Sequence, residues 1–75
     1  MTALPDLPIG ARARVCQVAG ADELCMRLLE MGLTPGVEVA VIGVAPLGDP
    51  LELEIRGYRL SVRRSEAARV EIDPL

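Results

Sequence analysis

The chain has 75 residues, of which 51% are hydrophobic and 25% are charged, and its formal net charge is −3. This composition is typical of a globular domain; it excludes a disordered chain and disfavours a partner with a phosphate backbone. A chain of this length buries only about 60% of its unfolded surface, so we expect one modest core and treat residues 1–75 as a single domain.

The first predicted elements are an irregular lead-in and a strand. Pro5 and Pro8 prevent a regular helix in the segment from Leu4 to Gly10. Residues 12–18 have imperfectly alternating apolar side chains, which predicts a strand that contains a bulge.

One substantial helix is predicted over Asp22–Met31. Its first residues are acidic, and the helix dipole favours negative charge at an N-terminus. Met26 lies off the apolar face, so we expect it to be exposed. That face is formed at helical spacing by Leu24, Cys25, Leu28, Leu29 and Met31.

The helix is expected to end at Gly32, because glycine takes the left-handed backbone conformation at little steric cost. Leu33 then falls where a hydrophobic residue packs back on the last helical turn. Pro35 and Gly36 predict a turn, since proline fixes its own φ and biases Thr34 away from helix.

Three further strands are predicted. Residues 37–44 are almost continuously apolar, which favours a strand buried on much of both faces. Residues 51–55 and 58–62 alternate cleanly, and a two-residue turn at Arg56-Gly57 joins them into a hairpin. This register places apolar residues opposite one another: Ile55 with Tyr58, Leu53 with Leu60, and Leu51 with Val62.

After the hairpin, Ser65 is expected to cap a helical turn over residues 66–68, and Val70 and Ile72 form a brief last strand. The fold class is therefore mostly β, with five short strands and one helix inserted between the first and the second. A small SH3-like barrel leaves the fewest exposed strand edges, so we predict that fold. A ferredoxin-like α+β fold is less favoured, because only one substantial helix is visible.

The sequence contains no set of catalytic or metal-binding residues. Histidine, the usual general base, is absent, so we expect neither an enzyme nor a cofactor. Cys16 and Cys25 lack the spacing of a metal or redox pair, and we expect two reduced, buried side chains and no specific metal site. With neither an apolar run of ~20 residues nor a signal-peptide pattern, the chain is expected to be cytoplasmic and not membrane-inserted.

Binding to nucleic acid is not favoured either. Proteins that bind single strands use basic grooves and stacking aromatics, whereas Tyr58 is the only aromatic residue here. We expect Tyr58 on the inward face of the hairpin. Arg59 lies opposite Glu54, and the two charges are expected to pair.

What remains is a surface for a protein partner, predicted in two regions. One is the outer part of the helix with its end, and the other is the loop at residues 45–50, where two prolines limit backbone freedom. The predicted partner-binding residues are Met26, Met31, Leu33, Pro46, Leu47 and Asp49. Two alternatives stay open: the loop is merely a stiff connection, and Met31 and Leu33 are merely core.

The order of the motifs resembles the FeoA family, the small cytoplasmic components of bacterial ferrous iron transport. The residues that carry it are Leu28–Gly36, Ala45–Pro50 and Leu60–Ala67, and the resemblance covers roughly residues 10–72. It implies an SH3-like barrel and a partner, the cytoplasmic G-protein domain or adjoining region of a FeoB-like transporter. That partner would hold the chain at the inner face of the membrane.

The resemblance leaves alternatives for function. The same barrel forms the C-terminal domain of iron-dependent repressors of the DtxR type, so the chain is alternatively an autonomous relative of that domain. A ribosome- or RNA-associated barrel is a third, less favoured hypothesis. A weak homodimer stays open, as does whether the protein activates, inhibits or assembles the transporter.

Overall fold

The computed structural model describes residues 2–75, which form one six-stranded antiparallel sheet and three short helical elements. The strands are β1 (Thr2–Ala3), β2 (Arg12–Val18), β3 (Glu38–Val44), β4 (Leu51–Ile55), β5 (Tyr58–Val62) and β6 (Val70–Pro74). The helical elements are the 3-10 helix η1 (Leu4–Asp6), α1 (Glu23–Glu30) and α2 (Arg64–Ala67).

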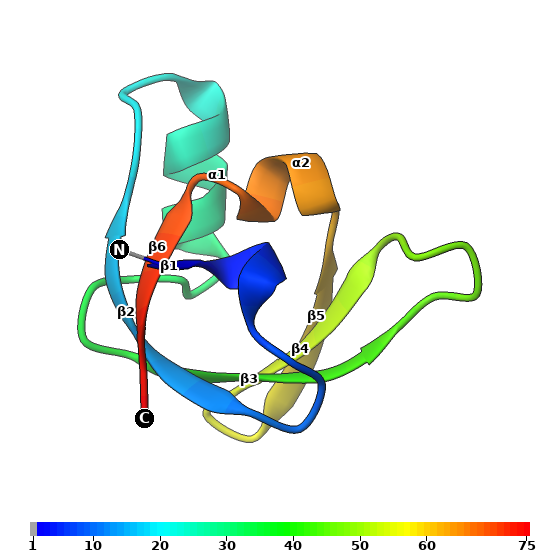
Figure 1. The fold of residues 1–75 in the computed structure, drawn as a ribbon. Helices are drawn as coiled ribbons and strands as arrows, with labels where there is room; N and C mark the ends of the chain where they lie inside the picture. The colour runs from blue at the N-terminus through cyan, green and yellow to red at the C-terminus, as the bar shows by residue number, and fades with distance from the viewer. Residues whose placement is uncertain (1) are drawn as a thin grey trace.

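The sheet order is β1-β6-β2-β3-β4-β5, and the sheet curls on itself (Figure 1). In Figure 1, α1 and α2 lie together at the upper end of the curled sheet, and the loop between β3 and β4 projects from its side. An ion pair between Arg27 of α1 and Glu66 of α2 joins the two helices. None of the helices in residues 2–75 is long and apolar enough to cross a membrane.

The predicted hairpin is confirmed residue for residue. In β4 and β5, Leu51 pairs with Val62, Leu53 with Leu60, and Ile55 with Tyr58. The turn uses positive φ at Arg56 (49°) and Gly57 (86°), as a two-residue hairpin loop requires.

Both central strands carry a bulge. The predicted bulge in β2 lies between Val15 and Gln17, and a second, which the sequence did not indicate, lies between Val41 and Gly43 of β3. Bulges bend a strand and increase its twist, which helps a short sheet to curl. The strand predicted over residues 37–44 was expected to be buried on much of both faces. This holds in β3, because the consecutive residues Val39 and Ala40 point to opposite faces and are both buried.

The core is aliphatic and fills the inside of the curled sheet. Its buried members are Leu4, Leu7, Ala13, Val15, Leu28, Leu33, Val37, Val39, Val41, Leu51, Leu53, Ile55, Val62, Ala67, Val70 and Ile72. Every strand except the two-residue β1 contributes to it, as do α1, α2 and η1.

Two features differ from the sequence prediction. The lead-in is more ordered than expected: Thr2 and Ala3 add a sixth strand against β6, and Leu4 is fully buried. The second is α2, which begins at Arg64 after an N-cap at Arg63 that makes no side-chain hydrogen bond, so Ser65 is not its cap.

Candidate functional site

The C-terminal end of α1 is a Schellman motif, as the glycine predicted. Gly32 has φ +109°, and its N–H donates to the Leu29 carbonyl at 3.0 Å. The Leu33 N–H donates to the Leu28 carbonyl at 3.2 Å. Two carbonyls that the helix leaves free are thereby satisfied, and the chain turns toward β3.

The apolar residues at this helix end differ sharply in exposure. Met26 is 57% exposed, as predicted, and Met31 is half-buried against the core. Leu33 is fully buried, because the Schellman geometry folds it back on Leu28. Leu33 is therefore core, and its assignment to a partner-binding surface was wrong.

Tyr58 is not buried, contrary to the expectation for the inward face of the hairpin. It begins the outermost strand and is 45% exposed. Its hydroxyl donates a hydrogen bond of 2.6 Å to the carbonyl of Met31. A Cβ at Gly32 would overlap that hydroxyl, so the glycine serves this contact as well as the helix stop.

The loop between β3 and β4 is built around a turn that leaves its tip in solvent. The Gly48 N–H donates to the Ala45 carbonyl at 2.7 Å, and the Ala45 N–H donates to the Pro50 carbonyl at 3.1 Å. Pro46 is exposed, and Leu47 is 97% exposed. A leucine held this far from any core contact has no packing role.

Arg64, which the sequence analysis did not single out, anchors the loop. Its backbone N–H donates to the Asp49 carboxylate at 3.0 Å, and its Nε donates to the Gly48 carbonyl at 2.8 Å. A third bond runs from the same guanidinium to the carbonyl of Pro5 at 3.4 Å. The Asp49 side chain thus caps α2, and no sequence pattern links it to a residue 15 positions away.

The two predicted regions do not form one patch. Figure 1 places α1 and the loop between β3 and β4 on different sides of the curled sheet, with α2 between them. We therefore treat them separately, as the helix-end surface (Met26 and Met31) and the loop surface (Pro46, Leu47 and Asp49).

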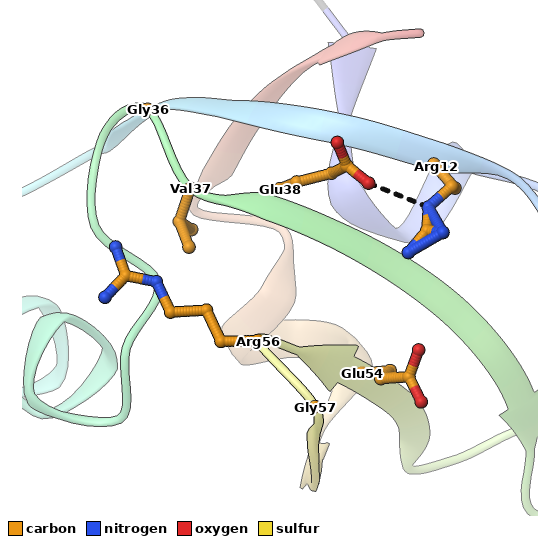
Figure 2. A pocket seen from close by; sticks show the side chains of 7 residues that line it. All are labelled: Arg12, Gly36, Val37, Glu38, Glu54, Arg56 and Gly57. Atoms are coloured by element: carbon orange, nitrogen blue, oxygen red, sulfur yellow. Dashed lines mark ion pairs between the residues drawn. The ribbon is translucent and has the colours of Figure 1, made fainter.

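A shallow hollow of about 290 Å³ lies between β3 and the turn of the hairpin. Figure 2 shows its charged side chains, among which Arg12 forms an ion pair with Glu38 at 2.9 Å. Positive and negative side chains both line the hollow, so its charge favours neither an anionic nor a cationic ligand. The lining residues are Arg12, Gly36, Val37, Glu38, Glu54, Arg56 and Gly57.

The N-terminal end of α1 is held by Asp22. Its carboxylate accepts the Cys25 N–H at 3.2 Å and forms an ion pair with Arg69 at 2.6 Å. The hydrogen bond from Arg69 is the main reason why the pKa of Asp22 lies below its ordinary value. This contact favours the folded state above the ordinary pKa of the carboxyl, and it is lost as the pH falls through the lowered pKa.

Thiols and carboxylates do not gather into a metal centre in the described part of the chain. No group of three or more Cys, Asp or Glu residues there can hold a metal ion. Cys25 is buried as predicted, whereas Cys16, at the β2 bulge, is only half-buried, and both thiols are free.

Comparisons with known proteins identify a matching family and several similar structures. A family model described as the FeoA domain matches residues 2–74. Over 70 residues the chain is 37% identical to the Fe(2+) transport protein A/Fe(2+) transporter FeoB fusion protein of Porphyromonas gingivalis. That match covers 93% of this chain but only 8% of the fusion protein, so the chain spans a small part of its relative.

Solved structures share the fold. FeoA from Stenotrophomonas maltophilia, crystallised in complex with zinc, is 34% identical, with a TM-score of 0.85 over 97% of this chain and 91% of that one. It is described as a prokaryotic SH3 domain protein, which confirms the predicted SH3-like fold. IdeR from T. acidophilum has a TM-score of 0.84 over 97% of this chain and 33% of its own, but at 18% identity it shares the fold alone.

Proposed function

The chain belongs to the FeoA family, as its motifs predicted, and we propose that it serves ferrous iron transport by binding a FeoB-like membrane transporter. The observation that carries this proposal is the P. gingivalis relative, in which a FeoA-like part and a FeoB transporter are one polypeptide. A covalent fusion keeps two parts at high effective concentration, which is useful when they act on each other. The docking site is the cytoplasmic G-protein domain or the region that adjoins it.

The proposed action is non-enzymatic and is independent of a resident metal. The sequence has no histidine to act as a general base, and the described residues contain no cluster of metal ligands. The protein therefore acts on the transporter through contact, and iron is the cargo of the partner.

The loop surface is the principal contact in this proposal. Burying one leucine side chain contributes about 1.5–3 kcal/mol, and Leu47 is 97% exposed in the free protein. Arg64 and the internal turn already fix the loop, so binding orders few additional groups. Met26 on the helix-end surface offers a second, adaptable apolar contact.

The test uses single substitutions that keep the fold. Leu47→Asp is expected to weaken binding to the purified cytoplasmic part of a FeoB-like transporter by at least about tenfold, and Met26→Asp by less. Ile9→Asp is the matched control, because Ile9 is also an exposed aliphatic residue (63%) but lies in neither surface. Iron uptake is measured in cells that lack the native protein.

Three results are informative. If only Leu47→Asp and Met26→Asp reduce binding and uptake, the surfaces are supported. Should Ile9→Asp reduce both equally, the effect is general and the surface assignment fails. Should the wild-type chain show no binding to the transporter, the proposed function itself fails.

The two alternative functions gain less support. The likeness to IdeR is one of fold only, so it does not support the alternative of a repressor-related domain. The RNA hypothesis requires stacking aromatics, and the single aromatic ring, Tyr58, already contacts the end of α1.

A further inference from the structure

β5 is an open edge of the sheet. It pairs with β4 on one side only, because it is the last strand in the order β1-β6-β2-β3-β4-β5. In a hairpin closed by a two-residue turn, alternate residues point their backbone groups away from the partner strand; here these are Arg59 and Ser61. Within residues 2–75, no other backbone or side-chain group bonds to the outward N–H or C=O of either residue.

The outermost row of side chains along this edge carries two arginines, and the glutamates on the same face, Glu52 and Glu54, lie one strand farther in, on β4. Arg59 lies within β5, Arg63 is the residue that follows the strand, and both are exposed. The expected ion pair between Arg59 and Glu54 is not formed, although the two residues are direct cross-strand neighbours. Among the described residues, no carboxylate lies within ion-pair distance of Arg59 or Arg63.

The inner face of the same edge is apolar and incompletely covered. Tyr58 is 45% exposed and Leu60 is half-buried, whereas Val62, farther along the strand, is buried. Side chains of an additional strand would lie beside Tyr58 and Leu60 and cover them. The helix α1 reaches this edge through the bond between Tyr58 and Met31.

We propose that β5 receives an extended segment of a protein partner as a seventh, hydrogen-bonded strand, with acidic residues alternating with apolar ones. The main-chain groups of Arg59 and Ser61 supply the hydrogen bonds, and the two faces of the edge supply the sequence preference. This inference goes beyond the proposed function, because it concerns a different surface and does not depend on which protein provides the segment.

Charge argues against a second copy of the chain as the occupant. Two β5 strands paired antiparallel about Ser61 would bring Arg59 of each copy toward Arg63 of the other, the residue that directly follows the strand. Like charges directly opposite each other destabilise a strand pair. The arginines thus protect the edge from self-pairing and leave it complementary to an acidic strand.

The test uses a blocked peptide, acetyl-Glu-Val-Glu-Val-Glu-Val-amide, with its Lys-for-Glu counterpart as control, added to the ¹⁵N-labelled full chain. We expect amide exchange at Arg59 and Ser61 to slow by at least about tenfold with the acidic peptide, while the lysine peptide has no effect. The amide of Leu60, which already faces β4, serves as the internal reference. Charge reversal through Arg59→Glu and Arg63→Glu should invert the peptide preference.

Ser61→Pro removes an outward N–H without removing a bond to β4, and Ser61→Ala is its matched control. We expect the proline variant to lose at least about tenfold in peptide affinity and the alanine variant to keep it. If Ser61→Pro unfolds the chain, the charge-reversal pair still decides. Equal binding of both peptides, protection elsewhere in the sheet, or slowed exchange that depends on protein concentration without peptide would overturn the proposal.

Discussion

The end of α1 and the loop between β3 and β4 each carry a leucine next to a glycine, but the two leucines have opposite environments in the fold. At the helix end, Leu33 is fully buried and Gly32 has the positive φ that the helix stop requires. In the loop, Leu47 is 97% exposed and makes no core contact. Polar bonds from Arg64, and not apolar packing, hold the loop in place.

This comparison distinguishes a motif whose residues are needed for folding from a motif whose leucine is not. Leu28 and Leu33 are buried in the core and Gly32 closes the helix, so this stretch is needed for stability in the absence of any partner. No such role exists for Leu47, whose burial fraction is near zero. An apolar side chain that folding does not require is the better candidate for a function, and this is why the loop surface leads the proposal.

The largest expected effect compares the two leucines directly. Leu33→Ala is expected to lower the free energy of unfolding by about 2–5 kcal/mol, because it leaves a cavity in the core. Leu47→Ala should change it by less than about 0.5 kcal/mol. Urea unfolding followed by circular dichroism measures both, and similar losses for the two variants would break the comparison.

The next effect concerns the helix stop. Gly32→Ala is expected to cost about 2–3 kcal/mol, since alanine is strained at φ +109° and its Cβ would overlap the Tyr58 hydroxyl. Gly10→Ala is the matched control, with φ +90° and nothing within 4 Å of the added Cβ, and should cost about 1 kcal/mol. Thermal melts give the difference; equal costs would mean that Tyr58 readily gives way.

The fold was largely predictable because its signals are local. The glycine stop, the bulge in β2 and the register of the hairpin depend on neighbouring residues or on strict alternation, and the structure confirms all three. Thr2 and Ala3 were missed because a two-residue strand has no periodicity; their partners lie about 70 positions away in β6.

The site was less predictable because its anchors are long-range. The bond from Tyr58 to Met31 and the bonds from Arg64 to the loop connect elements that only the folded sheet brings together. Leu33 and Leu47 are alike in the sequence, and their opposite exposure follows from the backbone path after each turn. The sequence around a turn does not show whether an apolar side chain beside it will be buried or exposed.

A smaller effect is expected where the hairpin supports the helix end. Tyr58→Phe removes the hydroxyl that donates to the Met31 carbonyl and should cost about 0.5–1.5 kcal/mol. Backbone amide shifts at residues 31–33 should change, while those of residues 45–50 should not. If the amide shifts of the loop change as strongly as those of the helix end, the two regions are not independent and the comparison fails.

The smallest change in stability, and the most informative for function, is expected in the loop anchor. Asp49→Ala removes the acceptor of the Arg64 N–H and should cost only about 0.5–1 kcal/mol, since the group is exposed. The freed loop must then be ordered on binding, so affinity for the transporter should fall by about two- to tenfold with Leu47 still present. Asp6→Ala, at an exposed carboxylate outside the loop, is the control. Calorimetric titration measures the affinity, and hydrogen exchange measures the order of the loop. If exchange rises in residues 45–50 while the affinity is unchanged, the anchored conformation of Leu47 is not the one that binds the partner.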